Sequence, residues 1–247
     1  MASTRAIIFR GKVGRLVYYE YRGRAGVRST PAQVRQTQAT KDSAKRFGQA
    51  VSMSAVIRSA LGSVLPDDTD RRRMYLLNKK LYQWLGGSPA HQPVGDPALS
   101  VIRGFELNPA TELPALLRPA IKVDWRAQGP VSLWLPAFIP SNDIRAPRGA
   151  ENLSWRIGVV SCTVESPSRV RKSFTEIIDL PYDARRQEER MISFPVNLSP
   201  GELGVLVMGL RFFVRNPAGP LEVTDPKWLP LGLVGGGYYH LAQSERR

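Results

Sequence analysis

The sequence predicts an α+β protein in two parts. A small β-meander with a helical hairpin is expected in residues 1–88, and an antiparallel β-sandwich, immunoglobulin-like or jelly-roll-like, in residues 99–242. The chain of 247 residues is 43% hydrophobic and can bury a sizeable core. Apolar residues recur at helical spacing between residues 41 and 86, whereas short β-rich runs punctuated by glycine and proline fill the second half. A Pro/Gly linker is expected over residues 89–98.

Residues 7–31 predict a basic three-stranded ribbon. We expect strands over 7–9, 16–21 and 27–30, with glycine-marked turns at 11–14 and 22–26. Alternation in the middle strand makes both faces partly apolar, and three strands cannot bury both. The ribbon should therefore dock on another surface. The residues expected at that interface are Ile7, Phe9, Leu16, Tyr18, Tyr19 and Tyr21.

Two helices are expected next, as a hairpin of antiparallel neighbours. The first spans residues 41–65 with Thr40 as its cap, and the second runs from cap candidates at 67–69 to Gly86. Their apolar stripes predict the buried positions. These are Phe47, Ala50, Met53, Ile57, Ala60, Leu61 and Val64 in the first helix, and Met74, Leu77, Leu81, Trp84 and Leu85 in the second.

Short strands and turns follow the linker. The candidate strands are 101–107, 121–125, 131–139, 153–164, 170–178, 191–196, 204–214 and 231–241. Prolines and glycines separate them at intervals typical of an antiparallel sandwich. Residues 243–247 are expected to form a tail.

The net charge of +14 is concentrated at one end of the chain. Residues 1–90 hold 17 Lys/Arg and 5 Asp/Glu, whereas residues 91–247 hold 18 and 16. This asymmetry favours a polyanion partner for the first part. Arginines interleaved with tyrosines suit phosphate contact and base stacking, and the alternative is a solvated basic surface over packed tyrosines. The candidate polyanion-binding residues are Arg10, Lys12, Arg15, Arg22, Arg24, Arg28, Lys41, Lys45, Arg71, Arg72 and Arg73.

Catalytic and cofactor motifs are not expected. The GKVG segment at 11–14 lacks the spacing of a phosphate-binding loop and precedes a strand, so it predicts a tight hairpin. Cys162 is the single cysteine, which excludes an intrachain disulfide and a thiolate zinc site. His91 and His240 are far apart in the sequence. We therefore expect a non-enzymatic protein without a cofactor.

The sequence shows neither a signal-peptide core nor an apolar run long enough to span a membrane. A cytoplasmic or virion location is therefore expected.

The first sixty residues resemble a group of proteins from Bacteroidota, phages and mobile elements that has no assigned activity. The positions that carry the resemblance are Gly11, Lys12, Gly14, Val17, Tyr18, Gly23, Val27, Arg28, Ser29, Pro31, Thr37, Arg46 and Phe47. The resemblance implies a ribbon-and-helix head followed by a β-sandwich, with a virion or assembly role.

Three functions are consistent with these features. The first is a structural subunit of a phage-like homo- or hetero-oligomeric assembly, with its basic region facing nucleic acid or an acidic neighbour. The second is a free-standing, non-sequence-specific nucleic-acid-binding protein. The third is a sandwich that binds glycans or surface proteins through Trp125, Trp134, Trp155 and Trp228, although these residues are more typical of a core.

Overall fold

The structure is a computed structural model that describes residues 10–21, 23–30, 36–62, 64, 71–87, 102–125, 129–167 and 170–239, without the side chains of 71–73. It divides into two compact units, Met1–Ser43 and Ala44–Arg247. The division falls inside the first helix, and not in the expected linker at 89–98, which lies outside the described residues together with the tail at 243–247. The reason is that both helices bury their apolar side chains in the second unit.

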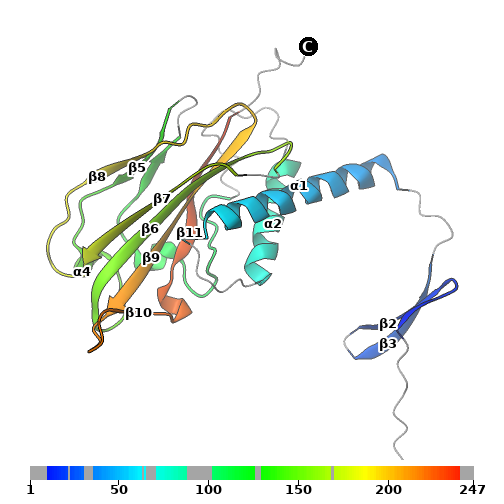
Figure 1. Ribbon diagram of the computed structural model, residues 1–247, viewed down its shortest axis with the longest axis horizontal. Helices are drawn as coiled ribbons and strands as arrows, with labels where there is room; N and C mark the ends of the chain where they lie inside the picture. Colours follow the sequence, from blue (N-terminus) through cyan, green and yellow to red (C-terminus); the bar gives the residue numbers. More distant parts are fainter. Residues whose placement is uncertain are drawn as a thin grey trace, which may run out of the picture. The chain divides into compact units, whose positions relative to one another are not determined.

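The first unit contains the three-stranded antiparallel N-terminal ribbon, made of β1 (Gly11–Val13), β2 (Leu16–Tyr21) and β3 (Arg24–Ser29) (Figure 1). Both turns have two residues, because Val13 pairs with Leu16 and Tyr21 pairs with Arg24. Gly14 and Gly23 supply the left-handed backbone, at φ 58° and 74°.

The prediction of the middle strand is confirmed, and the expected turns are too long. Residues 11–13 form a strand instead of a turn, and β3 begins at residue 24 instead of 27. The glycines allow turns so tight that the neighbouring residues join the ladders. The strand expected at 7–9 lies outside the described residues.

The two helices are α1 (Gln38–Ala60) and α2 (Arg71–Gly86). Thr37, and not Thr40, caps α1, because its Oγ1 accepts a hydrogen bond from the Thr40 amide at 3.2 Å. The helix ends at residue 60, before the expected residue 65. Figure 1 draws the two axes at a steep angle, so the helices cross and are not antiparallel neighbours.

Two antiparallel sheets follow in the second unit. The larger has the order β10-β9-β6-β7, and β11 also pairs with β9; the smaller has the order β4-β5-β8. The strands are β4 (Lys122–Asp124), β5 (Val131–Leu135), β6 (Ala150–Thr163), β7 (Val170–Pro181), β8 (Arg190–Phe194), β9 (Glu202–Val214), β10 (Leu221–Glu222) and β11 (Leu231–Tyr238). Single turns of helix lie at α3 (Leu113–Leu116), α4 (Pro140–Asp143) and η3 (Pro226–Trp228).

The expected strands from 121–125 onward each correspond to an observed strand, and the short β10 was not expected. The expected strand at 101–107 is wrong, because residues 102–107 form turns with a single bridge from Glu106 to Gly232. β5 ends before Pro136, which cannot donate a ladder hydrogen bond.

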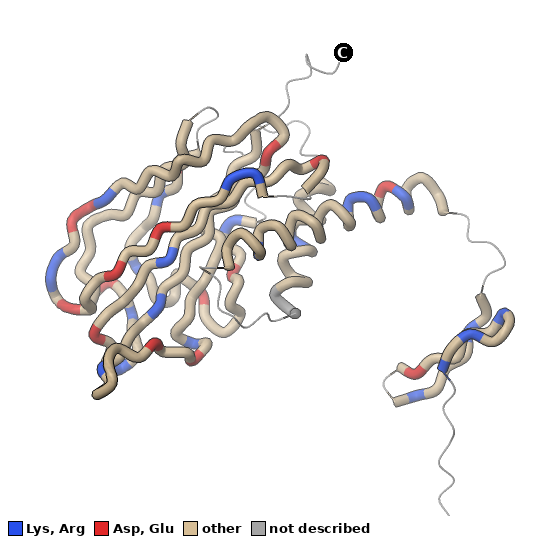
Figure 2. Tube along the Cα trace, in the orientation of Figure 1, with Lys and Arg blue, Asp and Glu red and all other residues tan. Residues whose placement is uncertain are grey.

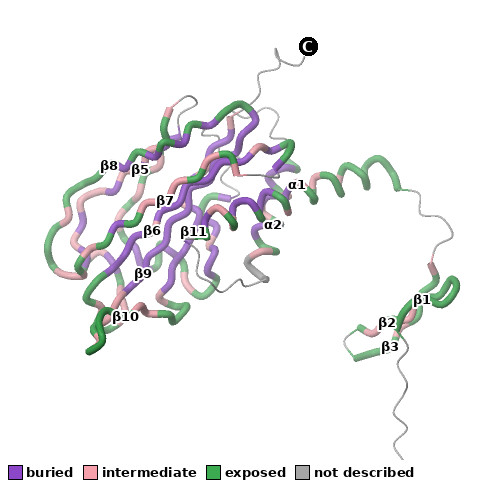
Figure 3. The backbone as a smooth tube through the Cα atoms, in the orientation of Figure 1, coloured by how far each residue is buried: buried purple, intermediate pink, exposed green. Residues whose placement is uncertain are grey.

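The central strands of the larger sheet, β6 and β9, are buried on both faces (Figure 3). On β9, Leu203, Val205 and Val207 join a core with the helices, whereas Leu206, Met208 and their successors join a core with the smaller sheet. The α+β class with antiparallel sheets is therefore confirmed. The immunoglobulin-like or jelly-roll-like topology stays a prediction.

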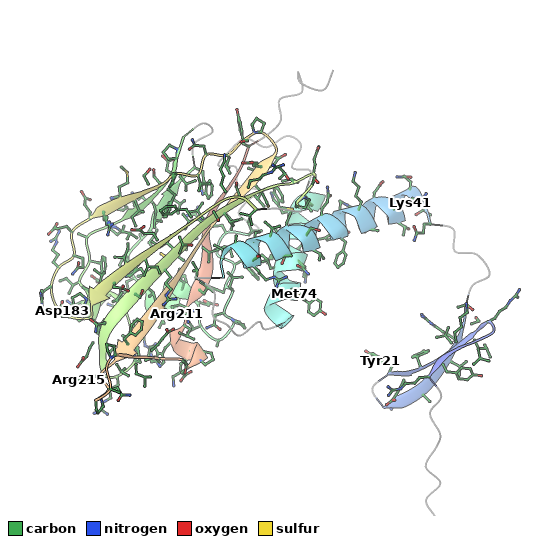
Figure 4. The ribbon with its side chains drawn as sticks, in the orientation of Figure 1. Tyr21, Lys41, Met74, Asp183, Arg211 and Arg215 are labelled. Carbon is green, nitrogen blue, oxygen red and sulfur yellow. The ribbon has the colours of Figure 1, made fainter. Side chains whose placement is uncertain are left out.

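Arg211 connects the segment that follows α1 to the larger sheet through a side-chain hydrogen bond. This β9 residue is buried, pairs with Glu222 at 3.5 Å, and donates a hydrogen bond to the Val64 carbonyl at 3.4 Å (Figure 4). Because a buried guanidinium is costly unless paired, these contacts specify where the chain meets the sheet.

The helical stripes are largely confirmed. The buried members are Ala50, Met53, Ile57, Leu61, Val64, Leu77, Leu81, Trp84 and Leu85. Phe47 is the clear error, with 55% of its surface exposed, because the buried part of α1 begins only at Ala50. Ala60 and Met74 are half-buried.

Candidate nucleic-acid interface

The strand register divides the N-terminal ribbon into two chemically different faces. Residues directly opposite each other in an antiparallel ladder share a face. Lys12 and Arg28 both pair with Val17, Tyr19 pairs with Gly26, and Tyr21 pairs with Arg24. We call this the cationic face, formed by Lys12, Val17, Tyr19, Tyr21, Arg24, Gly26 and Arg28.

The opposite side is the apolar face, formed by Val13, Leu16, Tyr18, Glu20, Ala25 and Val27. Val13, Leu16 and Val27 are 67%, 41% and 55% exposed. None of the described residues of the N-terminal ribbon reaches the buried class, which Figure 3 shows by the lack of purple on these strands. Both faces therefore have apolar side chains, as expected, and the register adds that Lys12, Arg24 and Arg28 all lie on one of them.

The single acid of the N-terminal ribbon is already neutralised. The Arg10 guanidinium pairs with the Glu20 carboxylate, whose side chain is 24% exposed. Among the described residues, Lys12, Arg24 and Arg28 have no acidic partner. Figure 2 shows the resulting concentration of basic positions on these strands. Cations without an acidic partner can bind phosphate groups, and arginine can also stack on bases.

Arg15 contributes a structural contact through its backbone as well as a positive charge. It occupies the first turn, and its carbonyl accepts hydrogen bonds from the Thr30 amide at 2.6 Å and the Thr30 hydroxyl at 2.8 Å. These bonds hold the end of β3 beside the first turn.

The other expected cations belong to the helices or lie outside the described residues. Lys41 and Lys45 are exposed on α1. Lys41 is in its first turn, where the helix dipole disfavours a cation. Arg71, Arg72 and Arg73 begin α2, but their side chains are not described.

The four described members of the six expected interface residues lie on both faces of the N-terminal ribbon. Leu16 and Tyr18 lie on the apolar face, whereas Tyr19 and Tyr21 lie on the cationic face. Period-two alternation already separates these pairs, but only the register shows which pair the cations accompany. Arg22, Ile7 and Phe9 lie outside the described residues.

A polar hollow in the second unit was missed by the sequence analysis. This cavity of about 600 Å³ is bordered by Glu106, Glu112, Lys80 and Arg103, among others. The pKa of Glu106 is raised to about 7, mainly by burial, while a hydrogen bond from the Leu113 backbone acts to lower the pKa and the charge of Glu112 acts to raise it. Burial created by the fold causes this shift, so no local pattern could have revealed it.

The tryptophans considered as a glycan platform are distributed through the second unit. Trp125 and Trp155 are buried in the core between the sheets. Trp134 and Trp228 are half-buried, with Lys122 Nζ 4.9 Å and Arg145 Cζ 5.9 Å from the centres of their rings. The preferred interpretation of Trp125 and Trp155 as core residues is thus confirmed.

Comparisons with protein-family models, curated proteins and solved structures found no significant match. Within the described residues, no three His, Cys, Asp or Glu side chains are grouped so that they could hold a metal ion. No helix among those residues is long and apolar enough to cross a membrane.

Proposed function

We propose that the chain is a non-enzymatic structural subunit of a larger, phage-like assembly. In this proposal the N-terminal ribbon contacts a neighbouring subunit with its apolar face and nucleic acid with its cationic face. The observation that carries the proposal is the register, which puts Lys12, Arg24 and Arg28 on one side and Val13, Leu16 and Val27 on the other.

The cationic face matches a phosphate backbone in charge and spacing. Lys12 and Arg28 flank β2 and are therefore about 10 Å apart across the sheet. Arg24 and Arg28 are separated by four residues of β3, which is about 13 Å. Three long, uncompensated side chains at these spacings can each reach a different phosphate.

The apolar face and the edge of the larger sheet support the subunit role. A three-stranded sheet with one exposed apolar face gains stability from a second layer. Separately, β7 is a twelve-residue edge strand of the larger sheet. An edge of this length can pair with a strand of another chain. The resemblance of the first sixty residues to phage-associated proteins points in the same direction.

Light scattering of the full-length protein after size exclusion tests the assembly. We expect a mass above that of one chain at high concentration. A strictly monomeric protein would refute the subunit role and favour the free-standing nucleic-acid-binding protein.

Titration of a labelled oligonucleotide at two salt concentrations tests the cationic face. Release of three counterions predicts binding to a single strand that is about twentyfold weaker at 200 mM than at 50 mM salt. The triple variant Lys12→Ala, Arg24→Ala, Arg28→Ala should lose most of this dependence. If the affinity for the oligonucleotide changes neither with salt nor in the triple variant, the cationic face is not a nucleic-acid interface. An acidic protein neighbour would then be the remaining candidate partner for this face.

A matched control removes the same charge from the second unit. Lys79, Arg103 and Arg186 are exposed there. Changing these three to alanine should leave the affinity within about twofold, because none of them belongs to the cationic face. An equal loss in both triple variants would show that net charge, and not the cationic face, drives binding.

A further inference from the structure

We infer that the cationic face takes single-stranded nucleic acid, with one base stacked on the ring of Tyr19, which Gly26 allows to lie across the sheet. This inference rests on the proposed function, since it concerns the same face. It adds the class of nucleic acid and the residue pair that selects it.

The contact between Tyr19 and Gly26 carries the inference. The two residues are cross-strand partners on β2 and β3. A Cβ atom placed on Gly26 would lie 2.7 Å from Cζ, 2.9 Å from Cε2 and 3.0 Å from Oη of Tyr19. The tyrosine ring therefore fills the space above the glycine. A side chain at position 26 would displace it.

The ring nevertheless remains available to a ligand. Tyr19 is 42% exposed although its Cζ, Cε2 and Oη atoms lie close to Gly26 of β3. In the inferred arrangement the ring lies over Gly26 with its other π-face outward, and every base can stack on such a face. Because Gly26 has no side chain, the ring of its cross-strand partner Tyr19 has room to lie over β3 and to accept a stacked base.

The neighbouring rows provide the phosphate contacts. The row of Lys12, Val17 and Arg28 lies two residues to one side of Tyr19, and the row of Tyr21 and Arg24 lies two residues to the other. Each row is about 7 Å from Tyr19 along the strand. A base on Tyr19 is then flanked by cations in both directions, as the phosphates flank each base of a single strand.

A duplex fits this face less well. Its bases are stacked on one another and expose only their edges inside the grooves. A ring held over a sheet does not reach those edges, whereas unpaired bases can turn onto it. Binding to a duplex would use the cations alone.

The test compares three probes on the full-length chain: a single-stranded 12-mer, the matching 12-base-pair duplex, and inorganic polyphosphate, which has charge without bases. Tyr19→Ala should weaken binding of the single strand about tenfold, the usual effect of losing one stacked base. Polyphosphate binding should change less than twofold. Tyr19→Phe should bind the single strand like the wild type.

Gly26→Val gives a second variant that keeps every cation and every tyrosine. Valine suits a strand, so the ladder should persist while the ring is displaced. We expect a selective loss for the single strand, as in Tyr19→Ala. An equal loss for polyphosphate in either variant would overturn the stacking role, because it would mean that the whole face had been disturbed.

The remaining outcomes separate the inference from the proposed function. If all three probes bind equally and Tyr19→Ala changes none of them, the stacking inference fails while the cationic face stands. Tighter binding of the duplex than of the single strand would likewise refute the stacking inference and leave the cationic face in place. If none of the three probes binds, the nucleic-acid part of the proposed function fails, and the inference with it.

Discussion

Gly158→Ala should destabilise the second unit by forcing the segment that follows α1 away from the larger sheet. A Cβ atom on Gly158 would lie 2.4 Å from Cδ2 of Leu61 and 3.1 Å from Cγ2 of Val64. The first distance is about 1 Å short of an ordinary carbon–carbon contact. Leu61 and Val64 are 0% and 1% exposed and have no solvent to move into. Overpacking of this kind costs about 1–3 kcal/mol.

Thermal and urea unfolding of the full-length chain measure this cost. For a protein of this size, the expected loss lowers the Tm by about 2–12 °C. Gly48→Ala on α1 is the matched control, since a Cβ atom there meets nothing within 4 Å. It should stabilise the protein by up to about 1 kcal/mol, because alanine is the better helix former.

A double-mutant cycle identifies the contact responsible. In a Leu61→Ala background the added methyl group enters the vacated space, so Gly158→Ala should become nearly neutral. A Gly158→Ala variant as stable as Gly48→Ala would refute the packing of Leu61 and Val64 against the larger sheet. A cost that persists in the Leu61→Ala background would refute Leu61 as its source.

Three further predictions concern other sites. Because burial raises the pKa of Glu106 to about 7, wild-type stability should fall as the pH rises from about 4.5 to 7. Glu106→Gln should therefore stabilise the protein by about 1–2 kcal/mol at pH 8, after allowance for solvent screening, and by little at pH 4. Urea unfolding at the two pH values measures this difference, and equal effects at both would contradict the prediction. Burial and the charge of Glu202 raise the pKa of Cys162 to about 12, so a thiol reagent at pH 8 should label it only in denaturant, and fast native labelling would be inconsistent with the fold. Val27→Asn, an uncharged change on the apolar face, should lower the assembly mass in light scattering without weakening oligonucleotide binding; an unchanged mass would mean that the apolar face does not make the subunit contact.

Local pattern was sufficient for several elements. The β-rich composition of residues 16–21 predicted β2 with its observed bounds, and Gly14 and Gly23 marked the turns beside it. The helical stripe predicted that Met53 and Leu61 are buried. These features depend on backbone preference and on periodicity within one element, and both can be read from neighbouring residues.

Local pattern failed where burial depends on a distant segment. Phe47 belongs to the same stripe as Met53, yet it is exposed, because the core under α1 does not reach it. The raised pKa of Glu106 could not be predicted for the same reason, because its carboxylate is buried against Gly232, which is far away in the sequence.

The sequence by itself determined that the N-terminal region is basic, glycine-turned and rich in tyrosine, because these are properties of composition and spacing. The tertiary structure decided which residues share a face, because this depends on which residue of one strand stands opposite which residue of the next. That register places Lys12, Arg24 and Arg28 with Tyr19 over Gly26, and leaves Val13, Leu16 and Val27 on the other side. It also assigned both helices to the larger sheet, since an apolar stripe shows that a helix must pack but does not show on what.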